Sequence, residues 1–330
     1  MNLPKVSIII PVKPGAEVRA LRSLARVSYP AELFEVLVAY GCKPSAQRNL
    51  AAREASGEIL YFLDDDSRVS PGFLQAAVRH YQDPEVAAVG GPSLTPPTDS
   101  PLQRAIGAAF ASAVGGGGVR NRYRKSGTAR RSCDSELILC NLSFRRETYL
   151  SHGGLDERLY PNEENELMDR LLHEGFHLVH DPELAVWRSQ RPSYRAYLRQ
   201  MFGYGRGRGE QTVLSGKLKP VSLAPAALLI YTLLLPFFAA VPFALPFLCY
   251  LALVAGASLL GARTARDWSL APRLFLIFPT LHLAYGAGTI RGLLRPRFRG
   301  GVRPAEGIEV SRVKGFGDIK GLTTEDSEES

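Results

Sequence analysis

Two long apolar stretches near the carboxyl terminus constrain the fold of this chain more than any other feature. Residues 221–240 and 243–260 contain no charged side chain, and each approaches the roughly 20 apolar residues that a helix needs to cross a bilayer. Their prolines, at positions 225, 236, 242 and 246, are tolerated in membrane helices, where neighbouring elements satisfy the freed backbone groups. The connection between the two stretches is very short, which predicts a hairpin of spanning helices.

A third apolar stretch, 274–290, is interrupted by Pro279, His282 and several glycines. Arginines follow both the second and the third stretch, and the positive-inside rule places both groups in the cytoplasm. Three full crossings cannot satisfy this requirement. Either the third stretch is re-entrant or interfacial, which we favour, or it spans the membrane and the rule fails here.

Charge and cysteine content narrow the classes of partner. The 330-residue chain has a net charge of +8 and a pI near 9.4, which suits an anionic membrane, a phosphorylated substrate or nucleic acid. Because basic residues gather beside the apolar stretches and no nucleic-acid motif is present, we expect membrane lipids and no nucleic acid as partners. The scattered cysteines indicate neither a zinc site nor a disulfide framework, and the first apolar run is too short for a signal peptide. Both observations fit a domain in the cytoplasm.

The residues before the apolar stretches alternate between β-branched runs and segments with helical spacing. Continuous apolar runs bounded by breakers are typical of strands that are buried on both faces. We expect strands at 6–11, 34–39, 58–63 and 86–90, and helices at 18–27, 45–55 and 71–80. This alternation predicts an α/β fold with a doubly wound, mainly parallel sheet, whose ligands bind at the carboxyl ends of the strands.

Three consecutive carboxylates directly follow the third expected strand. Asp64, Asp65 and Asp66 repel one another there, and a hard cation explains their proximity most simply. Mg²⁺ and Mn²⁺ prefer oxygen ligands, and Mg²⁺ is often held by one or two carboxylates together with substrate phosphates. A solvated acidic loop would contain the same residues, but the apolar strand before them favours a site for Mg²⁺ or Mn²⁺.

Five motifs, taken together, resemble glycosyltransferase family 2, whose fold is called GT-A. They are Val-Ser-Ile-Ile-Ile-Pro-Val at 6–12, Ala-Ser-Gly-Glu-Ile-Leu-Tyr-Phe-Leu-Asp-Asp-Asp at 55–66, Cys-Asn-Leu-Ser-Phe-Arg-Arg at 140–146, Gly-Gly-Leu-Asp-Glu at 153–157 and Asn-Glu-Glu-Asn-Glu-Leu-Met-Asp-Arg-Leu at 162–171. The resemblance covers roughly residues 5–210, and the order of the motifs is more specific than any one of them. Residues 194–208 and 282–286 are similar to a bacterial subgroup that builds exopolysaccharide repeat units on a lipid carrier.

The resemblance implies roles for the acidic motifs. Asp66 would bind the metal that bridges the diphosphate, and Asp64 would contact the ribose or assist the metal, with Asp65 beside them. Glu164 matches the catalytic base of the family's acidic pair, and Glu163 is its neighbour. A base opposite the leaving diphosphate takes the acceptor's proton and produces inversion, while a metal absorbs the charge of the leaving group. The simpler explanation for both glutamates is favourable charge at a helix amino terminus.

Other positions match the family only in part. Where relatives have a base-reading aspartate after the second strand, this chain has Tyr40, a candidate for stacking on the base. Where many relatives have a metal-binding histidine, it has Arg188, a candidate contact of the diphosphate. Gln200 lies in the element that helps to hold acceptor or diphosphate in the family. The remaining expected contacts of the nucleotide-sugar are Pro11, Arg48 and Asn141.

We therefore expect a GT-A catalytic domain at 1–215, a membrane module at 216–299 and a disordered tail at 300–330. The expected function is inverting, metal-dependent transfer of a sugar from a nucleotide-diphosphate sugar to a polyprenyl-linked acceptor in cell-surface polysaccharide assembly. The expected location is the inner membrane, as a multi-pass protein with its catalytic domain in the cytoplasm. The alternatives are a processive polysaccharide synthase and a catalytically inactive, membrane-anchored binding subunit.

Overall fold

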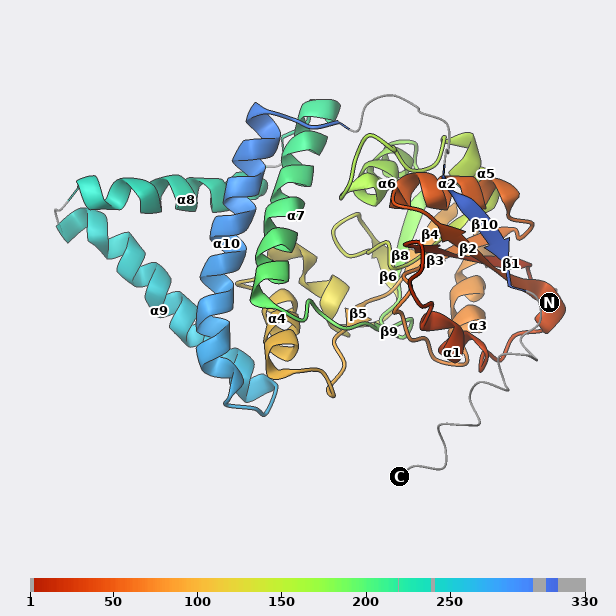
Figure 1. Ribbon diagram of the computed structural model, residues 1–330, viewed down its shortest axis with the longest axis horizontal. Coiled ribbons are helices and arrows are strands. Elements are labelled where there is room, and N and C mark those ends of the chain that lie inside the picture. Colours follow the sequence, from red (N-terminus) through yellow and green to blue (C-terminus); the bar gives the residue numbers. More distant parts are fainter. Residues whose placement is uncertain (1–2, 219, 239–240, 299–306, 314–330) are drawn as a thin grey trace.

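The computed structural model describes residues 3–218, 220–238, 241–298 and 307–313 (Figure 1). A sheet covered by helices forms one part of the molecule, and a group of long helices lies beside it (Figure 1). The chain forms the sheet first and then the long helices, and residues 309–312 return to the sheet. The candidate site lies in the first part, on the side that faces the long helices.

The sheet has eight strands in the order β10-β2-β1-β3-β7-β4-β8-β6. Its parallel pairs are β1 with β2, β1 with β3 and β4 with β8, whereas β7 runs antiparallel between β3 and β4. The strands are β1 Val6–Val12, β2 Phe34–Tyr40, β3 Ile59–Leu63, β4 Val86–Gly90, β6 Arg130–Ser132, β7 Asn141–Arg145, β8 His177–His180 and β10 Glu309–Arg312. The four expected strands are confirmed to within two residues at each end, and the sheet is mixed.

Both faces of the sheet are buried, which explains the uninterrupted apolar runs. In β1, Ile8 and Ile10 belong to one hydrophobic core and Ile9 belongs to the other, because successive strand residues point to opposite faces. The helices that cover the sheet are α1 Ala20–Leu24, α2 Pro44–Glu54, α3 Phe73–Val78, α5 Arg146–Ser151 and α6 Glu163–His173. The first and third helices are shorter than the sequence predicted, whereas α2 agrees with the expectation to within one residue at each end.

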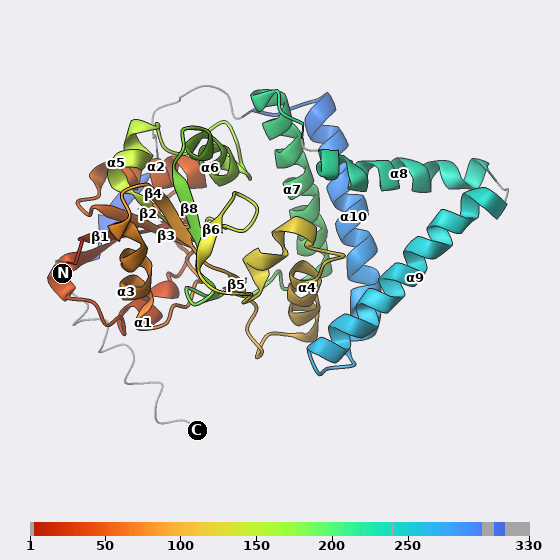
Figure 2. The same cartoon turned by 180° about the vertical axis from the view of Figure 1, so that it is seen from behind.

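Two long helices, α7 Tyr194–Ser215 and α10 Leu270–Leu294, pack in parallel beside the sheet. Their backbones approach closely: a Cβ atom added to Gly205 of α7 would lie 1.9 Å from the carbonyl oxygen of Tyr285 in α10. The shorter helix α4 Pro101–Ala111 packs against α10 and shares a hydrophobic core with it and with α7 (Figure 2). The contacts between α7 and α10 bring small residues of the two helices together.

The third apolar stretch forms the continuous helix α10, and the re-entrant or interfacial placement that we favoured stays a prediction. Pro279 lies inside this helix, and neighbouring side chains such as Ile277 and Phe278 are buried. The helix α10 packs along α7, whose glycines leave room for its backbone. His282 donates from Nε2 to the carbonyl oxygen of Val114, and its Nδ1 lies 2.9 Å from the hydroxyl of Tyr250, so it is a packed residue of the bundle.

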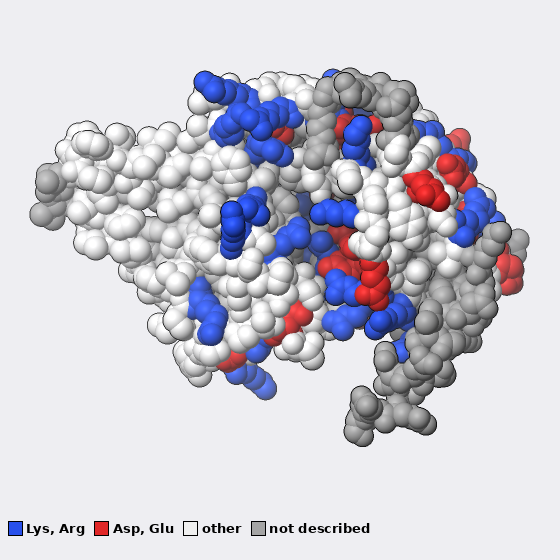
Figure 3. Space-filling view, in the orientation of Figure 1, with Lys and Arg blue, Asp and Glu red and all other residues white. Residues whose placement is uncertain are grey.

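The first two apolar stretches form an arm that projects from the rest of the molecule (Figure 1). It consists of α8 Ala224–Leu234, flanked by the 3₁₀ turns η4 Pro220–Leu223 and η5 Leu235–Phe237, and of α9 Val241–Thr264. Among the described residues, two helical segments are long and apolar enough to cross a membrane, Pro220–Phe237 and Pro242–Thr264. Only 6% and 11% of these segments are buried inside the molecule. In Figure 3 the projecting part of the arm shows no charged side chain on the visible face, and Arg263 lies in the last turn of α9.

Part of the expected disordered tail is a strand. β10 pairs antiparallel with the edge strand β2, and Arg312 forms an ion pair of 2.8 Å with Glu35, a nearly buried residue of β2. The exposed backbone of an edge strand accounts for this pairing, because its unpaired N–H and C=O groups accept another strand. Residues 300–306 and 314–330 of the expected tail lie outside the described residues.

Candidate active site

A cleft of about 470 Å³ lies at the carboxyl ends of β1 and β3. Acidic and basic side chains gather where the surface is hollowed between the sheet and the long helices (Figure 3). The cleft is lined by segments that are far apart in the sequence. They include Pro11–Lys13 at the end of β1, Pro44, Gln47 and Arg48 of α2, Asp64–Asp66 after β3, Ile138–Cys140 before β7, Tyr160, Pro161, Glu163 and Glu164 around the start of α6, and Arg188, Arg191 and Tyr204. This is the edge of the sheet at which the sequence predicted ligand binding.

The aspartates after β3 are held by two arginines from distant segments. Arg188 donates from Nε to Oδ1 of Asp66 at 2.8 Å and lies 3.0 Å, through Nη2, from Oδ2 of Asp64. Arg48 donates to the other oxygen of Asp64 at 2.8 Å. Burial raises the pKa of Asp64, but the charges of Arg188 and Arg48 lower it more, so Asp64 is ionised. Burial and the neighbouring aspartates raise the pKa of Asp65.

These carboxylates fit a divalent cation, with Asp66 as the principal ligand. Both oxygens of Asp64 already accept from guanidinium groups, whereas within the described residues only Oδ1 of Asp66 accepts a hydrogen bond from another side chain. Oδ2 of Asp66 therefore remains for a hard cation, which takes oxygen ligands and completes its shell with phosphates and water. Arg188 lines the cleft and contacts the two aspartates, and the diphosphate contact expected for it stays a prediction.

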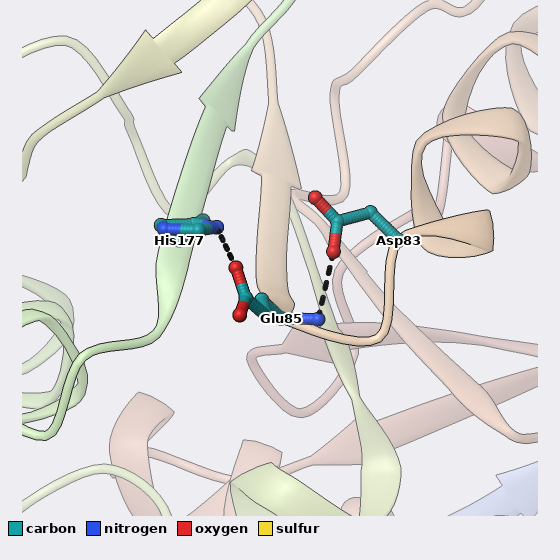
Figure 4. Close-up of side chains that lie close together, drawn as sticks. All are labelled: Asp83, Glu85 and His177. Atoms are coloured by element: carbon teal, nitrogen blue, oxygen red, sulfur yellow. Dashed lines mark hydrogen bonds and ion pairs between the residues drawn. The ribbon is translucent and has the colours of Figure 1, made fainter.

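A second group of potential metal ligands lies at the opposite edge of the sheet. Oxygen or nitrogen atoms of Asp83, Glu85 and His177 lie within 4.8 Å of one another (Figure 4). These residues precede or begin β4 and β8, so they lie at the amino ends of the parallel strands, away from the cleft. Arg131 lies 3.7 Å from Asp83 and 3.8 Å from Glu85 and supplies positive charge there. Protein side chains therefore already neutralise part of the negative charge of Asp83 and Glu85.

The glutamate pair enters the cleft from the first turn of α6. Asn162, just before the helix, adopts a left-handed conformation with φ of 97°, which asparagine tolerates better than most residues. The turn directs Glu163 and Glu164 inward, and their exposed fractions are only 2% and 9%. Burial and the charge of Glu164 raise the pKa of Glu163, although Arg48 lies 3.8 Å away. Glu163 is therefore protonated more readily than an ordinary carboxyl group.

The structure brings most of the predicted site residues together. Those that line the cleft are Pro11, Arg48, Asp64, Asp65, Asp66, Glu163, Glu164 and Arg188. Gln200 acts indirectly, because its side-chain amide donates to the hydroxyl of Tyr204, which lines the cleft. Tyr40 ends β2 beside Gly41, which lines the cleft, but Tyr40 itself does not.

Asn141 does not occupy the position that we expected for a sugar contact. Its side chain is fully buried in β7, where it accepts from the hydroxyl of Tyr61 and donates to the carbonyl oxygens of Leu184 and Pro92. These bonds join β7 to β3 and to the segment before β9 Val186–Trp187. Asn141 thus supports the scaffold behind the cleft.

Sequence reasoning missed several residues that line the cleft. Arg191 lowers the pKa of Asp64 together with Arg188 and Arg48. Its position three residues after Arg188 was the sequence feature that could have marked it as a site residue. Gln47 donates to the carbonyl oxygens of Val12 and Ala39 and so joins the carboxyl ends of β1 and β2. A glutamine on the buried face of α2 was the available signal for this role, since buried polar groups need partners.

Comparison with known proteins agrees with this fold. Residues 59–288 match the family described as Glycosyl transferase family group 2. A mannosyltransferase from Pyrobaculum calidifontis, solved with GDP-Man and Mn²⁺, has a TM-score of 0.54 and 18% identity, with 88% of this chain and 87% of that chain covered. This structural likeness concerns the fold, which is the GT-A fold.

Two curated relatives share part of their length with the chain. A pre-mycofactocin glycosyltransferase from Mycobacterium tuberculosis is 26% identical over 192 residues, which cover 58% of this chain and 40% of the relative. The O-antigen biosynthesis protein RfbC from Myxococcus xanthus is 29% identical over 237 residues, which cover 58% of this chain and 18% of the relative. The chain therefore matches less than half the length of either relative.

The protein belongs to glycosyltransferase family 2, because the family match spans most of the chain. The chain also has the GT-A fold, in which matched residues line one cleft.

Proposed function

We propose that the protein transfers a sugar from a nucleotide-diphosphate sugar to a hydroxyl or phosphate group of a lipid-linked acceptor, with inversion at the sugar. The observation that carries this proposal is the shared cleft: Asp66, which has an oxygen available for a cation, and Glu164 line the same cavity from different elements. The mannosyltransferase with the similar fold was solved with a nucleotide-sugar and Mn²⁺. This likeness supports the same class of donor here.

In the proposed reaction Asp66 would hold a divalent cation, Mg²⁺ or Mn²⁺, which would supply positive charge for the leaving diphosphate. Arg48 holds the carboxylate of Asp64 in place beside Asp66. Arg191 lines the cleft and adds positive charge near the expected diphosphate. The base of the nucleotide would lie toward Gly41 and Tyr40, at the end of β2.

Glu164 is the proposed base, which removes the proton from the acceptor as it attacks. A base in contact with the reacting hydroxyl typically contributes a factor of about 10² to 10⁴ to the rate. Its neighbour Glu163 has a raised pKa because it is buried beside Glu164.

The apolar arm supports a membrane-bound form. We propose that α8 and α9 enter the bilayer as a hairpin and that the catalytic domain lies on the cytoplasmic side. Because α10 packs along α7, the arginines after α9 and those after α10 then lie on one side of the membrane, as the positive-inside rule requires. This arrangement brings a membrane-borne acceptor, such as a polyprenyl-linked sugar, next to the cleft.

The test is transfer by the purified full-length chain in detergent, with a panel of nucleotide-sugars, a polyprenyl-linked acceptor and Mn²⁺. We expect Glu164→Gln to lower turnover by about 10² to 10⁴ while donor binding, measured by calorimetry, stays within about twofold. Glu166→Gln is the matched control, because Glu166 lies on the same helix and pairs with Arg170 outside the cleft. Near-normal turnover of Glu164→Gln would refute the choice of base. A wild-type chain that binds a donor but transfers nothing would favour an inactive binding subunit.

A further inference from the structure

A second, larger cavity lies outside the cleft, between the catalytic domain and the apolar arm. It has a volume of about 1010 Å³ and is lined by α4, by the 3₁₀ segment η3 Gly117–Tyr123 and its continuation, and by the second half of α9. Figure 2 shows this end of α9 beside α4, and buried residues of the two helices belong to one hydrophobic cluster. We call this cavity the α4–α9 groove.

Small residues on both walls create the space in the α4–α9 groove. On α9 the lining includes Gly256 and Ala257, and on α4 it includes Ala108 and Ala111. A Cβ atom added to Gly256 would meet no other atom within 4 Å, so this part of the helix faces open space. Since α9 is one of the two helices suited to a bilayer, the groove opens where a hydrocarbon phase would lie.

Three basic side chains line this mainly apolar groove, and one of them, Arg104, is paired with Asp267 at 2.9 Å. Arg124 and Lys125 follow η3 and line the groove. Within the described residues, Arg124 hydrogen-bonds through Nε to Asn121 and forms no ion pair, while Lys125 has one exposed pair with Glu183 at 3.3 Å. The exposed pair costs little to break, because surface ion pairs contribute about 0–1 kcal/mol. A phosphate group therefore finds two available cationic partners there.

Adjacent residues line the α4–α9 groove and the active-site cleft. Trp187, the last residue of β9, lines the groove, and the next residue, Arg188, lines the cleft. Tyr123 also lines the groove, and burial together with the nearby hydroxyl of Tyr204, which lines the cleft, raises the pKa of Tyr123. A molecule in the groove is therefore placed directly beside the reacting groups.

We propose that the α4–α9 groove binds the hydrocarbon chain of a polyprenyl phosphate or diphosphate acceptor, with its phosphate held by Arg124 and Lys125. A mainly apolar groove lined by a helix suited to a bilayer, with Arg124 outside any ion pair among the described residues and Lys125 in one exposed pair, is complementary to an anionic lipid with a long chain. The role of the bound lipid as a sugar acceptor rests on the proposed function. The groove as a lipid site can be tested independently of sugar transfer.

Trp187 provides a reporter inside the groove. The chain has two tryptophans, so Trp268→Phe leaves Trp187 as the only one, on the groove wall and 40% exposed. The full-length Trp268→Phe protein, in detergent, is titrated with a long-chain polyprenyl phosphate while Trp187 fluorescence is recorded. Polyprenol without phosphate and inorganic phosphate alone serve as reference ligands. We expect saturable binding of polyprenyl phosphate and at least tenfold weaker binding of either reference ligand.

Two further variants locate the binding within the groove. Gly256→Leu fills open space on the groove side of α9, and we expect it to weaken polyprenyl phosphate binding at least tenfold. Ala252→Leu adds an apolar side chain at an exposed position of α9 outside the groove lining and should leave binding unchanged. The double change Arg124→Ala and Lys125→Ala should reduce the affinity for polyprenyl phosphate to that for polyprenol. Equal thermal unfolding profiles confirm that each variant is folded.

The outcomes distinguish this inference from the proposed function. Unchanged lipid binding in Gly256→Leu, or inorganic phosphate that binds as tightly as the lipid, would overturn the groove assignment while leaving donor binding and Glu164-dependent transfer intact. Saturable lipid binding that Gly256→Leu weakens, in a protein that binds no nucleotide-sugar, would support the groove and refute the proposed function.

Discussion

The close approach of α7 and α10 allows a sharp prediction for one glycine. In Gly205→Ala the new methyl group would lie 1.9 Å from the carbonyl oxygen of Tyr285 and 2.9 Å from the amide nitrogen of Thr289. Both atoms belong to the backbone of α10, so no side-chain rotation relieves the contact. The two helices have to move apart by about 1 Å or more before a carbon and an oxygen reach an ordinary separation of about 3.3 Å.

The loss of unfolding free energy in Gly205→Ala depends on the length of the interface between α7 and α10. Gly209, Gly288 and Gly292 make similar backbone contacts, with added Cβ atoms 2.6, 2.1 and 2.2 Å from carbonyl oxygens of the opposite helix. Separating the helices at Gly205 therefore loosens the contacts at these positions too. Overpacking a close-packed interior costs about 1–3 kcal/mol, and a clash with rigid backbone along a whole helix pair belongs at the upper end, about 3 kcal/mol.

Gly203→Ala is the matched control. It lies two residues earlier in the same helix, and its added Cβ atom would meet nothing within 4 Å. Both variants gain the same helix propensity, about 1 kcal/mol for replacing glycine by alanine, so the difference between them isolates the clash. Unfolding of the purified chain in mild detergent should separate the two variants by about 3 kcal/mol, or on the order of 6 °C in Tm. Equal stability of the two variants would refute the close packing of α7 against α10.

Three further predictions concern the cleft and the core. Arg188→Ala removes the guanidinium that occupies oxygens of Asp64 and Asp66, and we expect at least severalfold tighter Mn²⁺ binding, measured by electron paramagnetic resonance; weaker binding would show that Arg188 helps to hold the cation. Glu163 has a raised pKa in the folded chain, so its contribution to stability is present at acidic pH and is lost as pH rises through that raised pKa. Glu163→Gln should therefore become more stable than the wild type toward alkaline pH in denaturant titrations, and a constant difference across pH would contradict this. Ser7 is fully buried and donates to Glu35 at 2.6 Å, so Ser7→Ala should cost about 1–3 kcal/mol in unfolding free energy; a loss below the error of the measurement would show that the network tolerates its removal.

Patterns that reflect local burial were predictable from the sequence. The run around Ile8 has to be apolar at every position because both faces of β1 are covered, and this requirement is visible in the sequence itself. The strand β7 escaped prediction because Asn141 and Ser143 are polar and yet fully buried. Their polar atoms are satisfied by partners such as Tyr61 and Tyr81, which come from distant parts of the chain. A hydropathy pattern does not predict hydrogen bonds between residues that are far apart in the sequence.

The candidate site divides in the same way. Asp64–Asp66 could be placed because they continue directly from a strand, and strand ends meet at one edge of the sheet. The contact of Arg188 with these aspartates could not, because it joins residues 122 positions apart. The packing of α10 had a sequence signal that we did not use: glycines at a spacing of four, Gly205 with Gly209 in α7 and Gly288 with Gly292 in α10. Small residues at this spacing let two helices approach closely.

The parallel direction of α7 and α10 has a topological consequence for the apolar arm. Tyr197 of α7 bonds to Ile277 of α10, and Gly209 contacts Gly292, so both helices run the same way. The chain must therefore travel back along the full length of α7, about 33 Å for 22 residues, before α10 begins. Helices α8 and α9 make this return. About ten extended residues cover the same distance, so a short hydrophilic bridge in place of the arm would preserve the connectivity of the helix pair and remove the two segments that are long and apolar enough to cross a membrane.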